Sequence, residues 1–106
     1  MRTLNKNLKE YINLLKKERY FDAHEALEEI WFPRRFEDDD EMKLLKGFIN
    51  AAVSFELKKR GREEPSKRVW KNYLKYRVLL DGIESEYKDE YIKMAKFVEE
   101  LNINKH

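Results

Sequence analysis

The fold is decided by residues 41–60, which read EMKLLKGFINAAVSFELKKR. Apolar side chains recur in this stretch every three or four residues, as on an α-helix, and they cover more than half of the helix circumference. A helix that is apolar on several sides packs against other elements on several sides. We therefore predict a central core helix over residues 41–60, which Gly61 ends.

Shorter amphipathic stretches flank this core helix. They predict further helices over roughly residues 3–18, 23–32, 67–80 and 87–101. We expect Asp22 and Ser66 to cap the second and fourth helices, residues 34–40 to form an exposed acidic loop, and residues 102–106 to fray. No segment alternates with the period of a β-strand. The sequence thus predicts an all-α fold, a single compact bundle of about five helices over residues 1–106.

The composition is that of a folded cytoplasmic protein. Hydrophobic residues make up 42% of the 106 residues, enough to fill one core although another 42% are charged. No run of about 18 apolar residues is present, so we expect no membrane partner. Because cysteine is absent, disulfides, thiolate metal sites and cysteine nucleophiles are excluded. The abundance of ionic residues and the lack of glutamine are typical of thermophilic proteins.

The second helix carries the most informative polar pattern. His24 and Glu28 are one helical turn apart, Trp31 lies on the same border of the apolar face, and Glu25 points away from the core. In the core helix the carboxylate of Glu56 falls inside the apolar stripe, and a buried carboxylate requires a hydrogen-bonding or charged partner. If the two helices pack antiparallel, we expect one pocket or polar cluster, formed by His24, Glu25, Glu28, Trp31, Asn50 and Glu56.

Three interpretations of this polar cluster remain open at the level of sequence. It is a structural His24–Glu28 pair with Glu56 neutralised by a basic residue, or it binds an organic or anionic ligand. In the third, His24, Glu28 and Glu56 hold a divalent metal, since one imidazole with two carboxylates is a common ligand set for iron, manganese or zinc. No cofactor is expected apart from such a metal.

Catalysis has thin support in the sequence. No motif of a catalytic nucleophile surrounds Ser54 or Ser66, and the second histidine, His106, is the last residue. A metal-dependent or water-activating hydrolase would have to use His24, Glu25 and Glu28 (all three in the second helix). We therefore expect a noncatalytic binding or interaction module, with such a hydrolase as the alternative.

The fourth helix suggests a different partner. Residues 58–77 contain nine basic and two acidic side chains, although the net charge of the chain is only +2. Lys67, Arg68, Lys71 and Lys75 line one side of this helix, where they could contact phosphates or nucleic acid. The simpler interpretation is a solvated face that pairs with the acidic stretch 37–41 of a neighbouring chain in a homo-oligomer.

The order and spacing of several of these residues resemble a known family. Residues 21–31, followed by 46–53 and 59–61, are similar to the small helical family catalogued as domain of unknown function 309, over about residues 19–62. The family's Ala-His-Glu, apolar pair, Glu and Trp correspond to His24, Glu25, Glu28 and Trp31. Its Gly-Leu-Ile-Gln-Ala-Ala corresponds to residues 47–52, where Asn50 stands for Gln, and Glu56 stands where many members have an aromatic residue or His. The resemblance implies an all-helical domain with an inward-facing His-Glu-Glu-Trp cluster and brings no established activity.

Overall fold

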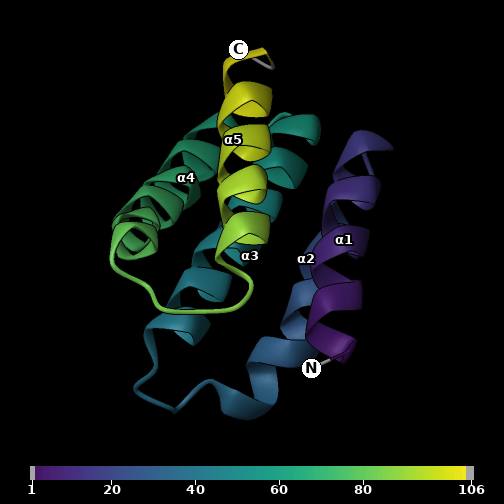
Figure 1. The fold of residues 1–106 in the computed structure, drawn as a ribbon. Helices are drawn as coiled ribbons and strands as arrows, with labels where there is room; N and C mark the ends of the chain where they lie inside the picture. Colours follow the sequence, from purple (N-terminus) through teal and green to yellow (C-terminus); the bar gives the residue numbers. More distant parts are fainter. Residues whose placement is uncertain (1, 105–106) are drawn as a thin grey trace.

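The computed structural model describes residues 2–104, which form five α-helices joined by short connections (Figure 1). The helices are α1 (Arg2–Lys16), α2 (Tyr20–Trp31), α3 (Asp40–Lys59), α4 (Glu63–Arg77) and α5 (Lys88–Asn104), with 3-10 turns η1 (Phe32–Arg34) and η2 (Val78–Asp81). No strand occurs within residues 2–104. The predicted all-α bundle of about five helices is confirmed. None of these helices combines the length and the apolar character that crossing a membrane requires.

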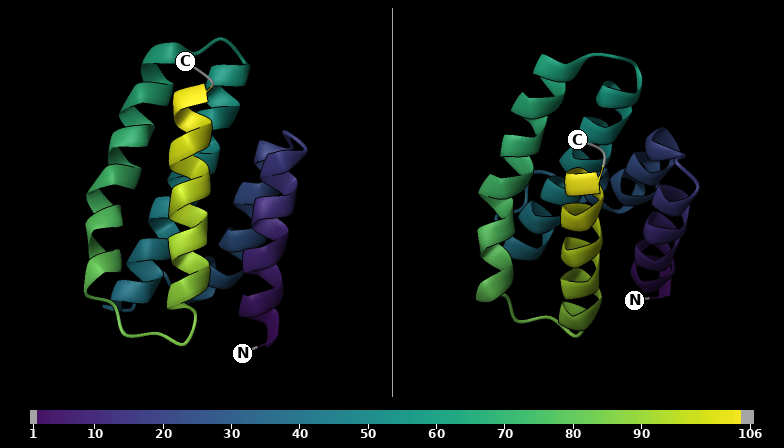
Figure 2. Two further views of the ribbon diagram at one scale, coloured as in Figure 1. Left: turned by 45° about the horizontal axis from the view of Figure 1, so that its top comes forward. Right: turned by 90° about the horizontal axis from the view of Figure 1, so that it is seen from above.

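Helix α3 is the centre of the bundle. It packs against α2 on one side and α4 on the other, and α1 packs on α2. Figure 2 shows α5 lying in front of α3, between α4 and α1. Half of the 20 residues of α3 are buried, and they come from several sides of the helix: Met42, Leu44, Leu45, Gly47, Phe48, Ile49, Ala51, Ala52, Ser54 and Phe55. This burial explains the broad apolar pattern of residues 41–60.

Small residues bring α3 and α4 close together. A β-carbon added to Gly47 would lie only 2.9 Å from the β-carbon of Tyr76, so glycine is required for this approach. Farther along, Ser54 donates a hydrogen bond to the backbone oxygen of Ser66 (3.0 Å), and Ser66 donates one to the backbone oxygen of Ser54 (2.8 Å). Both serines are buried. The pair satisfies two hydroxyls and joins the helices at the same time.

Two buried tyrosines fasten α5 to the rest of the bundle. Tyr91 donates to Glu41 at the start of α3 (2.6 Å), and Tyr73 of α4 donates to Glu99 of α5 (2.6 Å). Burial raises the pKa of both tyrosine hydroxyls above the usual range, and the hydrogen bond to a carboxylate raises each pKa further. Both hydroxyls therefore stay protonated and act as donors in the folded protein.

Three local expectations were wrong. Asp22 does not cap α2, because the helix begins earlier at Tyr20, whose buried ring packs on Phe55 at 5.6 Å between centroids. Ser66 does not cap α4, because that helix begins at Glu63 and Ser66 turns inward to Ser54. Residues 102–104 are helical rather than frayed. His106 lies outside the described residues.

Candidate functional site

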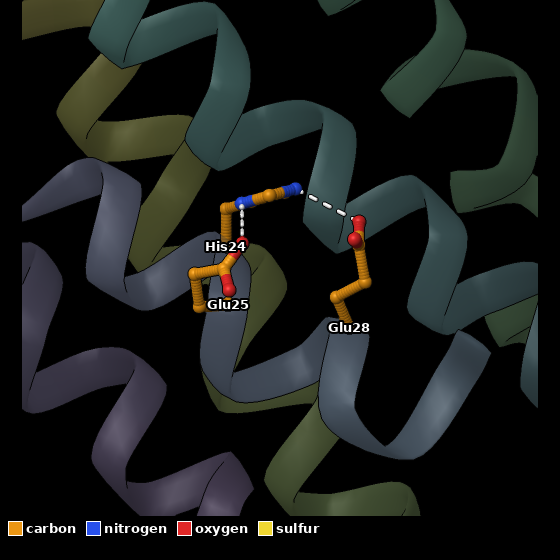
Figure 3. Close-up of side chains that lie close together, drawn as sticks. All are labelled: His24, Glu25 and Glu28. Carbon is orange, nitrogen blue, oxygen red and sulfur yellow. Dashed lines mark hydrogen bonds and ion pairs between the residues drawn. The ribbon is translucent and has the colours of Figure 1, made fainter. Parts of the chain in front are cut away.

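His24 is held between two carboxylates of its own helix. Its Nε2 lies 2.9 Å from Oε2 of Glu28, one turn later, and its Nδ1 lies 3.2 Å from Oε1 of Glu25 (Figure 3). Only the contact with Glu28 has the geometry of a hydrogen bond, so the buried Nδ1 atom lacks a hydrogen-bond partner. The side chain of His24 is 16% exposed, compared with 54% for Glu25. The imidazole is thus the inner member of the group.

A pocket of about 250 Å³ opens beside His24, where the start of α2 meets the end of α3. This meeting reflects antiparallel packing of the two helices. The pocket has an apolar wall and a polar rim, and its lining residues are Tyr20, Phe21, His24, Val53, Glu56, Leu57, Arg60 and Arg62. Phe21 is 55% exposed, and its ring lies 5.5 Å from the imidazole of His24, centroid to centroid.

The two arginines come from the end of α3 and the turn that follows. Arg60 is one helical turn after Glu56, and its Nε donates to Oε2 of Glu56 at 2.6 Å. Gly61 has a φ of +80°, a conformation that favours glycine, and it turns the chain back so that Arg62 reaches the pocket. Arg62 makes no ion pair with the residues described here. One guanidinium is therefore fixed by a carboxylate and the other is available.

A family profile described as Domain of unknown function (DUF309) matches residues 8–69, more than half of the chain. This chain belongs to the DUF309 family. The matched region runs from α1 into α4 and contains both His24 and the pocket residues on α3. Searches of curated proteins and of solved structures found no match.

Trp31 and Asn50, which were expected in the same cluster, each contact Lys46 on this DUF309 domain. Lys46 of α3 places its Nζ 4.3 Å from the centroid of the Trp31 ring, a cation–π contact. The amide of Asn50 donates to the backbone oxygen of Lys46 at 2.8 Å. Of the six residues of the expected cluster, only His24 and Glu56 line the pocket.

Sequence reasoning missed three contributors to this region. Arg60 could have been found, because it follows Glu56 at the i, i+4 spacing of a helical ion pair. Phe21 precedes His24 by three residues, which also places the two on one helical face. Arg62 gave no such signal, because its position depends on the turn at Gly61.

The metal ligands expected from the sequence are regrouped in the DUF309 structure. Potential ligand atoms of His24, Glu25 and Glu28 lie within 4.8 Å of one another, whereas Glu56 is paired with Arg60. Glu25 and Glu28 approach opposite nitrogens of the imidazole. A metal held by one of these nitrogens would leave the other nitrogen beside a carboxylate, an arrangement that orients metal-bound histidines. In that arrangement one imidazole nitrogen and one carboxylate would hold the metal, and the second carboxylate would orient the ring.

The basic residues of α4 lie apart from the pocket. Lys67, Arg68, Lys71 and Lys75 are all exposed, and none of them lines it. Trp70 is half-buried against the rings of Phe55 and Tyr73, with centroids 5.9 and 4.7 Å away. Of the three aromatic residues near these lysines, Tyr73 is fully buried and Tyr76 packs over Gly47. This face presents charge with two half-buried aromatic rings, Trp70 and Tyr76, and the Nζ of Lys75 lies 5.2 Å from the centroid of the Tyr76 ring.

Proposed function

We propose that this DUF309 domain is a noncatalytic binding module that takes a small organic anion in the pocket beside His24. The observation that carries the proposal is the convergence of Arg60, Arg62 and His24 on one pocket of about 250 Å³. Guanidinium groups donate two parallel hydrogen bonds to carboxylates and phosphates, and Arg62 is available for this. The anion therefore carries a carboxylate or a phosphate group.

The remaining lining limits the size and character of the ligand. Val53 and Leu57 form an apolar wall, and the exposed ring of Phe21 stands at the rim beside His24. Drug-sized ligands occupy pockets of about 300–1,000 Å³, so this pocket suits a smaller molecule. A single ring or a short apolar chain bearing one anionic group matches both the volume and the lining.

The serine hydroxyls support binding rather than covalent chemistry. Ser54 and Ser66 hydrogen-bond to each other between α3 and α4, and Ser85 donates to Glu41. None of these three serines lines the pocket beside His24. A bound anion would thus meet two arginines and an imidazole, groups that orient a ligand without forming a covalent bond to it, and the single lining carboxylate, Glu56, is already paired with Arg60.

Phenyl phosphate is a suitable probe, because it combines one ring with a dianion. In a titration followed by ¹H–¹⁵N NMR, we expect saturable shifts around Arg62 and His24, and none with the neutral analogue benzyl alcohol. Arg62→Gln should weaken binding about tenfold or more, since hydrogen bonds between charged groups contribute about 1.5–3 kcal/mol. The matched control, Arg68→Gln, removes an exposed arginine from α4. Equal losses in both variants would refute the pocket and indicate general charge attraction.

A divalent metal at His24, Glu25 and Glu28 is a second candidate, favoured by the 4.8 Å grouping of their ligand atoms. Native mass spectrometry of the tag-free protein with excess zinc tests it. One zinc per chain that is lost in His24→Ala and retained in Arg62→Gln would support the metal site, and with it the hydrolase alternative. A metal-free spectrum under the same conditions would exclude zinc binding there.

A further inference from the structure

A second groove lies between α4 and the end of α5. Its volume is about 260 Å³, and it is lined by Ser54, Ser66, Lys67, Trp70, Lys71, Leu74 and Asn102. The floor is apolar, and Leu74 is 46% exposed although it is a large aliphatic residue. Lys67 and Lys71 are exposed at the rim. A cavity of about 150 Å³ is enough to accept benzene, so this groove can accommodate an aromatic side chain.

The connection between α2 and α3 carries a side chain of the right kind. Phe36 is 88% exposed, more than any other large hydrophobic residue among those described. The guanidinium of Arg35 lies 3.6 Å from the centroid of the Phe32 ring and 4.5 Å from that of Phe36, so it links the two rings. A phenyl ring in water is unfavourable, and its burial against another apolar surface is favourable.

The residues beside Phe36 match the charge of the groove. Residues 37–40 are four consecutive acids directly after Phe36. Arg34 pairs with Glu37 and Asp39, and Lys43 pairs with Asp38, so the loop is braced by ion pairs. With Arg34, Lys43 and Arg35 included, residues 34–43 contain three bases and five acids and so carry an excess of negative charge. An aromatic side chain next to acids therefore has its counterpart in an apolar groove next to lysines.

The two features lie too far apart to meet within one molecule. The α2–α3 connection is at one end of the bundle, whereas the first half of α4 and the end of α5 are at the other (Figure 1). The longest dimension of the molecule is 35 Å. Phe36 can therefore enter this groove only on another molecule, and a second copy of this chain supplies both the ring and the charge.

We propose that the protein self-associates head to tail, with Phe36 of one copy in the Trp70–Leu74 groove of the next. Residues 37–40 then face Lys67 and Lys71 across the contact. Because the contact joins two different surfaces, an open assembly has an unused loop at one end and an unused groove at the other, unless it closes into a ring. Charge complementarity sets the orientation and makes the association weaken with added salt, while burial of the ring supplies most of the affinity.

Sedimentation velocity of nuclease-treated protein, from about 5 µM to about 1 mM, measures the association directly. We expect Phe36→Ala and Leu74→Glu each to weaken it about tenfold or more, as truncation of a central contact residue does. Ile92→Glu is the matched control, because Ile92 is 48% exposed on α5 and lines neither the loop nor the groove. Circular dichroism checks that all variants fold.

Mixing the two variants tests the head-to-tail geometry. Phe36→Ala keeps an intact groove and Leu74→Glu keeps an intact loop, so an equimolar mixture should form a one-to-one dimer and nothing larger. Wild-type protein that stays monomeric to about 1 mM would overturn the proposal. A mixture that stays monomeric, or association that disappears on nuclease treatment, would also overturn it. Loop–loop contacts would instead leave Leu74→Glu alone as strongly associated as wild type, and groove–groove contacts would do the same for Phe36→Ala, so either result also contradicts the head-to-tail geometry.

Discussion

Gly47 of α3 and Tyr76 of α4 lie so close that a β-carbon on the glycine would be 2.9 Å from the β-carbon of the tyrosine. The atom in the way is the root of the tyrosine side chain, so a change of its rotamer cannot relieve the contact. Glycine is normally unfavourable in the middle of a helix, by about 1 kcal/mol relative to alanine. At this position the close packing of the two helices outweighs that cost.

Gly47→Ala should therefore destabilise the protein although alanine favours helix. Overpacking costs about 1–3 kcal/mol, which exceeds the gain in helix propensity, so we expect a net loss of about 1 kcal/mol. Urea unfolding followed by circular dichroism measures it. Gly82→Ala is the control, because nothing lies within 4 Å of its added β-carbon. A stabilised Gly47→Ala variant would mean that α3 and α4 are not this close.

The Ser54–Ser66 pair should show energetic coupling. Each serine donates to the backbone of the other, and each single alanine substitution disrupts part of the shared network. We expect a coupling free energy of about 1 kcal/mol in a double-mutant cycle of Ser54→Ala and Ser66→Ala. Additive effects of the two substitutions would contradict the hydrogen bonds between the helices.

Adjacent acids before α3 should differ in their contribution to stability. Oδ1 of Asp39 accepts from the backbone N–H groups of Glu41 (2.8 Å) and Met42 (3.4 Å), so Asp39 is the N-cap of the core helix. Asp39→Ala should cost about 1 kcal/mol in unfolding free energy. Asp38 pairs with Lys43 at the surface, and Asp38→Ala should leave the urea midpoint unchanged. Equal losses would mean that net charge, rather than the cap, is responsible.

Stability should fall in alkaline solution. The folded state raises the pKa of Tyr73 above that of the unfolded chain, which is about 10. Below pH about 10 this tyrosine is protonated in both states, and above it only the unfolded chain loses the proton, so the stability contributed by Tyr73 declines. Wild type should lose up to about 1.4 kcal/mol per pH unit more than Tyr73→Phe above pH about 10. Parallel curves for the two proteins would contradict the protonated hydroxyl.

The sequence predicted the helices well because their apolar spacing is a local property. The core helix was expected over residues 41–60 and runs from Asp40 to Lys59. The predicted start of the fourth helix was wrong because it depended on a contact between residues far apart in the sequence. Serine is a residue type that often caps helices, but Ser66 hydrogen-bonds to Ser54, twelve residues earlier on another helix. No local sequence pattern reveals that contact.

The candidate site was only partly predictable for a similar reason. His24 and Glu28 are neighbours on one helix, so their spacing was enough to pair them. The environment of Trp31 depended on the neighbouring helix, which places the Nζ of Lys46 over its ring, and Asn50 bonds to the backbone of its own helix instead of entering the pocket. Arg62 reaches the pocket because Gly61 adopts a positive φ. The glycine indicates a turn at this point of the sequence, but it does not predict where the side chain after the turn will lie.

The two tyrosine–carboxylate hydrogen bonds that join α5 to α3 and α4 limit which substitutions relatives of this fold can accept. These two bonds, Tyr91 with Glu41 and Tyr73 with Glu99, each join residues far apart in the chain. Glu41 also accepts from Ser85 and Glu99 from Arg77, so loss of either tyrosine would leave a half-buried carboxylate with one of its two donors, which is costly. We therefore expect relatives that replace one member of a pair to replace the other as well. An alignment of homologues would show this as two pairs of positions that evolve together, and as a barrier to changing either residue alone.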